Sequence, residues 1–175
     1  SKQGWFMHLR KELEKENFEV ISPEMPDTFS PKIKEWTLKL NEVSGEVNEN
    51  LYFIGHSMGC QTIMRFSEKL KGNKKIGGAV FIAGWFNLTD KTWDETYTKK
   101  IADEWINTPI NFRNVKKHVK KIFAIFSDND PYVPLSDSKL FSDNLNADIM
   151  IIKNREHIEE LNKDEMKKIV EFIKE

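Results

Sequence analysis

The chain lacks a second cysteine: Cys60 is the only one among 175 residues, so no internal disulfide can stabilise the fold. It also lacks any apolar run that approaches the roughly 18 residues of a membrane-spanning helix, and it shows no secretory signal pattern. We therefore expect a cytoplasmic protein, although a sequence that starts at Ser1 leaves a targeting segment upstream open.

An excess of charge of one sign is also missing. The 27 basic and 28 acidic residues leave a net charge of −1. A chain with this balance has no global field that attracts nucleic acid or an anionic membrane. Lysine clusters near 74–75 and 116–121 alternate with apolar residues, as in the solvated face of an amphipathic segment. We expect neither nucleic acid nor a membrane as a partner.

What the sequence does contain is a regular alternation of short apolar runs with longer segments of helical period, over a length that suits a single domain at 1–175. The apolar runs lie at 18–21, 51–54, 79–83, 122–126 and 148–152. Unbroken apolarity is typical of strands that are covered on both faces. Strands that alternate with helices imply parallel pairing, so the predicted fold class is α/β with a mainly parallel central sheet.

Four segments carry apolar residues at the three- or four-residue spacing of a core-facing helix. They are Trp5, Leu9 and Leu13; Ile33, Trp36, Leu40 and Val43; Ile63, Phe66 and Leu70; and Met166, Ile169, Val170 and Ile173. Ser30 and Pro31 predict the start of the second helix, and Gly72 predicts the end of the third. Asn162 and Glu165 have the spacing of a capping-box variant before the last.

Residues 55–59 read Gly-His-Ser-Met-Gly, directly after an apolar run and at the start of a helical segment. The pentapeptide matches the nucleophile elbow of an α/β-hydrolase, in which a sharp strand-to-helix turn exposes the serine, here Ser57. So tight a turn predicts that neither Gly55 nor Gly59 has room for a side chain. Cys60, in the first helical turn, is expected to pack the helix on the sheet as a small buried residue.

A serine hydroxyl needs a base within hydrogen-bond reach, and the base needs a carboxylate that orients it. In α/β-hydrolases the chain order is serine, acid, histidine, each on a loop at the carboxyl end of a strand. The acid is therefore expected after the run at 122–126. Asp130 is the first choice because Pro131 fixes the backbone beside it, and Asp128 is the alternative.

Asp128, Asn129 and Asp130 also look like the start of a calcium loop. The glycine and the distal glutamate of such a loop are missing, and Lys139 occupies its twelfth position. We therefore expect no metal and no cofactor.

Four histidines compete for the role of the base. His8 falls on the first predicted helix and His118 in a lysine-rich segment. His56 is adjacent to the nucleophile, with its side chain expected to point elsewhere. His157 is the one that follows the last predicted strand, so it is the predicted base.

These residues predict a reaction. His157 takes the Ser57 proton as the hydroxyl attacks an acyl carbon, Asp130 orients and stabilises the imidazolium, and water later releases the acyl-enzyme. The backbone N–H of Met58, at the start of a helix, is placed to stabilise the oxyanion.

Residues 85–118 interrupt the alternation of strands and helices. They hold Trp85, Phe86, Trp93, Tyr97 and Trp105 among many polar residues. In α/β-hydrolases an excursion at this point often covers the active site, so Trp85 and Phe86 are candidates for the substrate pocket. Alternatively, these aromatic side chains pack a surface helix onto the sheet.

Over nearly its whole length the chain resembles the small α/β serine hydrolases of the retinoblastoma-binding protein nine type and their bacterial relatives. The resemblance rests on Gly4-Trp5-Phe6, residues 11–15, Met25-Pro26-Asp27, residues 55–59, Asp130-Pro131 and His157. It implies that Ser57, Asp130 and His157 form the catalytic triad. It also implies esterase-like or peptidase-like hydrolysis of a small-molecule or peptide substrate.

Two features depart from that family. A glycine or small residue usually precedes the histidine, where this chain has Glu156 after Arg155. Members also begin with an apolar strand next to the nucleophile strand, and the loop after it supplies the second oxyanion donor. We therefore expect a sheet without its first strand and a native N-terminus beyond Ser1; an intact native mass near 20.6 kDa with full activity would contradict this.

The sequence thus predicts a serine hydrolase that cleaves ester or amide bonds. The alternative is a protein-binding module that keeps the hydrolase scaffold but has lost turnover.

Overall fold

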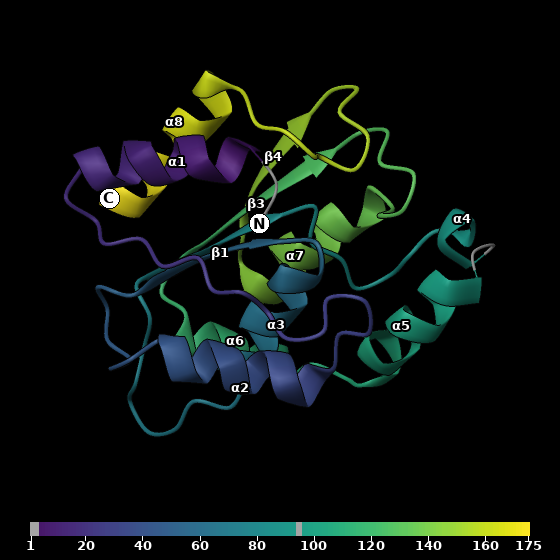
Figure 1. The fold of residues 1–175 in the computed structure, drawn as a ribbon, viewed down its shortest axis with the longest axis horizontal. Coiled ribbons are helices and arrows are strands. Elements are labelled where there is room, and N and C mark those ends of the chain that lie inside the picture. Colours follow the sequence, from purple (N-terminus) through teal and green to yellow (C-terminus); the bar gives the residue numbers. More distant parts are fainter. Residues whose placement is uncertain (1–3, 94–95) are drawn as a thin grey trace.

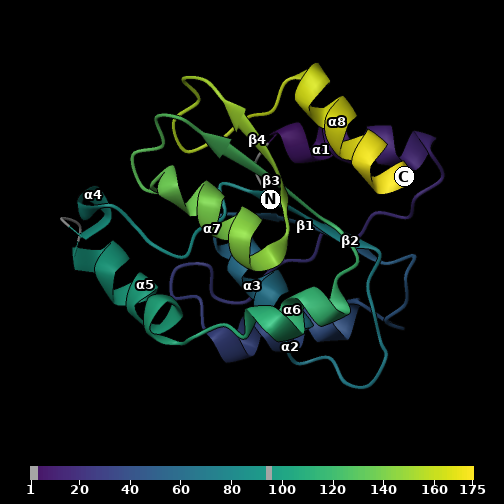
Figure 2. The same ribbon diagram turned by 180° about the vertical axis from the view of Figure 1, so that it is seen from behind.

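Four strands form one sheet in the computed structural model, which describes residues 4–93 and 96–175. They are β1 (Tyr52–His56), β2 (Gly78–Ile82), β3 (Ile122–Ser127) and β4 (Asp148–Ile152). All pair in parallel in the order β1-β2-β3-β4, so each strand lies beside its successor in the chain (Figures 1 and 2). Four of the five predicted strands are confirmed, and their carboxyl ends meet at one edge of the sheet.

Helices cover both faces of this sheet (Figures 1 and 2). One face carries α1 (Gly4–Lys15) and α8 (Lys163–Lys174), and the other carries α2 (Ile33–Val43), α3 (Met58–Ser67), α6 (Phe112–His118) and α7 (Ser136–Leu145). The arrangement is a three-layer sandwich, and the predicted α/β class with a parallel central sheet is confirmed. Within residues 4–93 and 96–175, no helix combines the length and the apolarity that crossing a membrane requires.

Each face of the sheet has its own core. Val80, Ile82 and Ile125 pack with α1 and α8, whereas Phe81 and Ala124 pack with the helices of the opposite face. All five side chains are fully buried. Because successive strand residues point to opposite faces, a sheet that is covered twice requires strands that are apolar at every position.

Residues 85–118 contribute α4 (Asp90–Trp93), α5 (Thr96–Asn107) and α6. Trp105 of α5 is buried and packs edge-on against Trp36 of α2, with ring centroids 5.9 Å apart. Its Nε1 donates to the Pro31 carbonyl at 3.0 Å. Trp105 therefore fastens α5 to the helical layer, as the packing alternative predicts. The side chains of Trp93 and Tyr97 lie outside the described part of the structure.

The segment 18–21 forms no strand, so this prediction is wrong. A strand needs a hydrogen-bonded neighbour, and the described pairing of β1 is with β2 alone, which leaves its other edge open. Residues 18–23 and β1 line a common cleft of about 810 Å³. Residues 18–21 have the composition of a strand, but in the described part of the chain no strand pairs with them. A further strand beside β1 stays a prediction.

The start of α2 also differs from the prediction. The helix begins at Ile33, and Lys32 occupies the N-cap without a side-chain cap. Ser30 instead donates its N–H to the Asp27 carboxylate at 3.2 Å. The Ser30-Pro31 pair therefore belongs to the turn before α2 rather than to its first residues.

Of the two other predicted helix ends, the end of α3 is wrong and the start of α8 is confirmed. α3 ends at Ser67, well before Gly72, because the chain tightens there into a turn in which Leu70 donates to the Ser67 carbonyl. The capping box before α8 is confirmed. The Asn162 side chain accepts the Glu165 N–H at 2.9 Å, and the Glu165 carboxylate accepts the Asn162 N–H at 2.8 Å.

Candidate active site

Ser57 stands at the turn from β1 into α3, in a backbone conformation (φ 49°, ψ −114°) that L-residues rarely adopt. Two backbone hydrogen bonds hold it there. Its N–H donates to the Ile82 carbonyl of β2 at 2.9 Å, and its carbonyl accepts the Cys60 N–H at 3.0 Å. The strained turn between strand and helix is the geometry of a nucleophile elbow.

The two glycines of the pentapeptide differ in their need for a bare backbone. A Cβ on Gly55 would lie 2.7 Å from the Ile63 side chain and 2.8 Å from the Cys60 backbone nitrogen, so glycine is required there. A Cβ on Gly59 would meet no atom within 4 Å, because Gly59 lines the open cleft. The prediction of steric necessity therefore holds for Gly55 and is wrong for Gly59.

Cys60 is fully buried, as predicted, and its Sγ lies 3.2 Å from the Gly55 carbonyl. Burial raises the pKa of the thiol far above its ordinary value, so the group stays protonated. Cys60 is a packing residue between α3 and the sheet.

Asp130 and His157 lie on the loops after β3 and β4, and their side chains meet. His157 Nδ1 lies 2.8 Å from Asp130 Oδ2. The other carboxylate oxygen accepts the N–H groups of Tyr132 and Val133, at 2.8 and 3.0 Å. The Asp130 side chain is only 2% exposed, so this acceptor is fixed and shielded from water. The contact leaves His157 Nε2 as the nitrogen that is available for chemistry.

The backbone of the His157 loop is held by three further side chains, from the last residue of β3 and the loop that follows it. The hydrogen bonds run from Asn154 N–H to Asp128 Oδ1 (2.8 Å), from Arg155 N–H to Ser127 Oγ (3.1 Å) and from Glu156 N–H to Asn129 Oδ1 (2.9 Å). With the contact to the imidazole, each residue of 127–130 binds one residue of 154–157. We call these four contacts the loop clamp. Asp128, the alternative acid, therefore binds backbone and not the imidazole.

The polar pair before His157 is accommodated in two different ways. Arg155 donates to the Glu160 carbonyl at 2.6 Å and lies 3.4 Å from the Glu165 carboxylate of α8, so its side chain points away from the cleft. Glu156 is exposed and has φ 47°, in the left-handed region that favours glycine. The backbone conformation at this position therefore favours a glycine, in agreement with what the family resemblance implies.

Replacing Glu156 by glycine is expected to raise the free energy of unfolding by about 0.5–1 kcal/mol. Relief of the left-handed strain outweighs the extra backbone entropy that glycine gives to the unfolded chain. Urea unfolding measures the change. The matched control is Glu160→Gly in the same loop, where φ is not positive and the substitution should destabilise. Equal destabilisation by both changes would show that Glu156 carries no strain.

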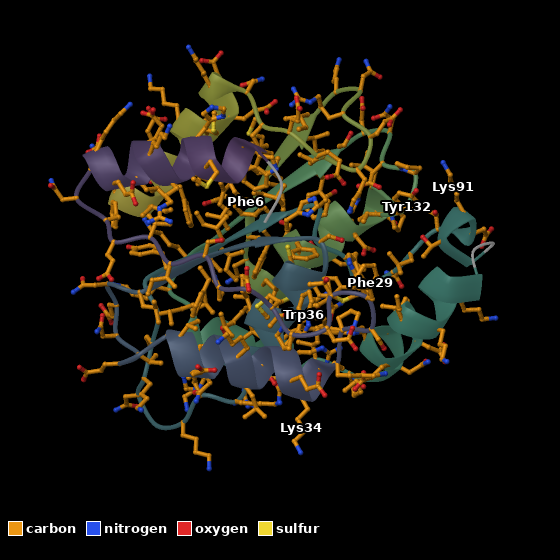
Figure 3. The ribbon with its side chains drawn as sticks, in the orientation of Figure 1. Phe6, Phe29, Lys34, Trp36, Lys91 and Tyr132 are labelled. Carbon is orange, nitrogen blue, oxygen red and sulfur yellow. The ribbon has the colours of Figure 1, made fainter. Side chains whose placement is uncertain are left out.

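Tyr132 connects the His157 loop to α4. Its ring packs edge-on against the His157 imidazole, with centroids 5.6 Å apart. Lys91 Nζ lies 5.5 Å from the centre of the Tyr132 ring, and Figure 3 shows the two side chains close together. The Thr89 N–H donates to the Tyr132 carbonyl at 2.9 Å. Tyr132 thus limits the movement of the imidazole, a role that no sequence pattern indicated.

His56, the last residue of β1, lies beside His157 with ring centroids 5.2 Å apart, so the prediction that its side chain points elsewhere is wrong. Burial lowers the pKa of His56 to about 4, and the charge of His157 acts in the same direction. The ring is therefore neutral at neutral pH. Among the described residues its buried Nε2 has no hydrogen-bond partner.

This lowered pKa predicts a dependence of stability on pH. A histidine whose folded-state pKa lies below the ordinary 6.5 stabilises the fold above that pH, and the contribution is lost as the pH falls toward about 4. Between pH 7 and 5, His56 should account for a loss of about 2 kcal/mol in the free energy of unfolding, despite the opposing charges of Glu159 and Asp130.

Urea unfolding at the two pH values checks this expectation. His56→Asn should show a smaller loss than the wild type, whereas His8→Asn, which changes an exposed histidine on α1, should behave like the wild type. Identical pH dependence in all three proteins would mean that His56 is not protonated on unfolding.

The cleft along β1 reaches the elbow. Ser57, Met58 and Gly59 are among the residues that line it, and its walls are mainly apolar, with Phe6, Leu9, Val20, Ile54 and Ile63 among them. Met58 is the first residue of α3, so its N–H has no acceptor within the helix. A helix N-terminus also favours negative charge.

Neither Trp85 nor Phe86 lines this cleft. Trp85 is 2% exposed and belongs to the core. Phe86 stacks on Phe141 of α7, with ring centroids 4.3 Å apart, and meets Phe112 of α6 edge-on. Both aromatic side chains therefore pack helices onto the sheet, and a part in substrate binding stays a prediction.

The chain is similar in sequence to known hydrolases. The sequence profile described as serine hydrolase matches residues 1–165. The putative hydrolase YdeN of Bacillus subtilis is 26% identical over 157 residues, which are 90% of this chain and 79% of that protein. The serine hydrolase RBBP9 of Rattus norvegicus is 24% identical over 171 residues, which are 97% of this chain and 86% of that protein.

Solved structures show the same fold. The crystal structure of the B. subtilis ydeN gene product superposes with a TM-score of 0.84 at 22% identity, covering 98% of this chain and 91% of the other. A carboxylesterase structure from the thaumarchaeon Nitrososphaera gargenis gives a TM-score of 0.68 at 14% identity, covering 97% and 84%. With its parallel sheet, its strained elbow and a family profile that spans most of its length, the chain belongs to the serine hydrolase family.

Proposed function

We propose that this serine hydrolase cleaves ester or amide bonds through Ser57, His157 and Asp130 by way of an acyl-enzyme. The observation that carries the proposal is the 2.8 Å contact between His157 Nδ1 and Asp130 Oδ2, at the same edge of the sheet as the Ser57 elbow. The buried carboxylate fixes the imidazole with Nε2 directed away from Asp130, as a general base requires.

Each side chain then has one task. His157 Nε2 accepts the Ser57 proton as Oγ attacks the acyl carbon, and Asp130 stabilises the imidazolium that forms. The imidazolium returns the proton to the leaving alcohol or amine. Water, activated by the same nitrogen, then releases the acyl group from Ser57.

Stabilisation of the oxyanion is assigned to the Met58 N–H at the start of α3. The cleft that reaches Ser57 is mainly apolar. It therefore favours an apolar acyl group or an apolar peptide side chain over a charged one, because burial of apolar surface contributes about 25 cal/mol per Å².

Labelling by a fluorophosphonate probe tests the proposal directly. The probe phosphonylates an activated serine, so the wild type should be labelled and Ser57→Ala should not. Ser142→Ala, which changes an exposed serine on α7, is the matched control and should be labelled like the wild type. Absence of label on the folded wild type, or equal label on Ser57→Ala, would favour a scaffold without turnover.

A further inference from the structure

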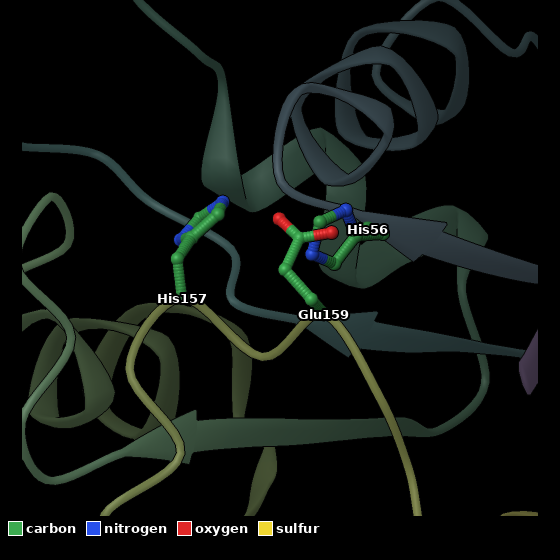
Figure 4. A group of neighbouring side chains, drawn as sticks. All are labelled: His56, His157 and Glu159. Atoms are coloured by element: carbon green, nitrogen blue, oxygen red, sulfur yellow. The ribbon is translucent and has the colours of Figure 1, made fainter. Parts of the chain in front are cut away.

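Three groups that bind transition metals gather next to Ser57. His56 ends β1, while His157 and Glu159 come from the loop after β4, and Figure 4 shows the Glu159 carboxylate between the two imidazoles. One potential ligand atom from each residue lies within 4.8 Å of the other two. Two imidazoles and one carboxylate are a common set of protein ligands for zinc.

The two histidines offer suitable lone pairs. Asp130 occupies His157 Nδ1 at 2.8 Å, so the free nitrogen is Nε2, and a carboxylate behind a ligating histidine is the usual support of a metal site. His56 Nε2 is buried and lacks a hydrogen-bond partner among the described residues. A buried nitrogen without a partner is costly, and a bound cation would satisfy it.

We propose that His56, His157 and Glu159 form an inhibitory site for a divalent transition metal, with zinc as the fitting ion. In a tetrahedral zinc site with bonds near 2.1 Å, ligand atoms lie about 3.4 Å apart, so the three ligand atoms must move closer together. Glu159 is exposed, and its side chain can make that adjustment. The fourth position remains for water.

Occupation of the site has a defined chemical consequence, which rests on the proposed function. A metal bound at His157 Nε2 takes the lone pair that would accept the Ser57 proton. Zinc is therefore a reversible inhibitor, and a chelator restores turnover.

Binding is tested first, without reference to activity. Chelator-treated protein is titrated with Co²⁺, whose visible absorption reports tetrahedral coordination, and with Zn²⁺ by calorimetry. The wild type should bind one equivalent of each, and Glu159→Gln should weaken binding by about tenfold or more. Glu160→Gln removes the same charge one residue further along and should bind like the wild type. Equal binding by Glu159→Gln, or no tetrahedral cobalt spectrum, would overturn the site.

Inhibition is tested on an ester substrate as the ratio of rates with and without zinc, so that differences in basal rate between variants cancel. Glu159→Gln should need about tenfold more zinc than the wild type and Glu160→Gln the same amount as the wild type. Turnover that zinc does not affect would refute the inhibitory role. A third outcome is that the protein binds cobalt through Glu159 but, when it is freed of metal, hydrolyses no substrate. That outcome would support the metal site and contradict the proposed hydrolase reaction.

Discussion

Asp130→Asn is expected to lower kcat about 10⁴-fold, with a much smaller change in KM. The asparagine Oδ1 still accepts the N–H groups of Tyr132 and Val133, which fixes the orientation of the amide. Its Nδ2 then replaces the oxygen that faces His157 Nδ1. Two donors cannot share that contact, so the imidazole is held in the tautomer whose Nε2 carries the proton and is no longer a base.

Asp128→Asn is the matched control, two residues away in the same loop. Asp128 uses Oδ1 to accept the Asn154 N–H, and an asparagine Oδ1 does the same. Activity should stay within a few-fold of the wild type. Steady-state kinetics of both variants on one ester, with circular dichroism to establish folding, decides the assignment. A larger loss from Asp128→Asn than from Asp130→Asn would make Asp128 the acid.

Much of the fold could be predicted because each buried face of a helix or strand requires apolar residues at a regular spacing in the local sequence. Residues 79–83 are apolar throughout since both faces of β2 are buried, and Trp5, Leu9 and Leu13 repeat every four residues since α1 packs on one side. Residues 18–21 are also a short apolar run, but they form no strand. Strand formation also depends on a neighbour in space, which composition does not encode.

In the candidate site, too, some features could be predicted from the local sequence and others could not. Ser57, Asp130 and His157 each follow a predicted strand, and parallel pairing brings the three strand ends to one edge of the sheet. Chain order was therefore enough to predict the contact between His157 and Asp130, while the catalytic roles of the three residues stay a prediction. The approach of His56 to Glu159 depends on where the loop after β4 turns. The need for glycine at position 59 depends on whether a neighbour fills the cleft. Neither follows from local sequence.

The loop clamp leads to a second large effect, on the position of the base. Asn129 Oδ1 accepts the Ser127 hydroxyl and the Glu156 N–H, both at 2.9 Å. Asn129→Ala removes that acceptor directly before His157, where the backbone is already in a left-handed conformation. The loop relaxes and the imidazole shifts. Since a misplacement of about 1 Å costs on the order of 10²-fold in rate, we expect kcat to fall about 100-fold.

Kinetics separates this positioning role from a general loss of stability. KM should change far less than kcat, because Asn129 does not line the cleft. Asn129→Asp keeps an acceptor for the Glu156 N–H and should recover most of the lost rate, although its charge lies near Asp130. Asn41→Ala, at an exposed position of α2, should leave both constants unchanged. If Asn129→Ala and Asn129→Asp lose activity equally, the hydrogen bond to Glu156 does not position the base.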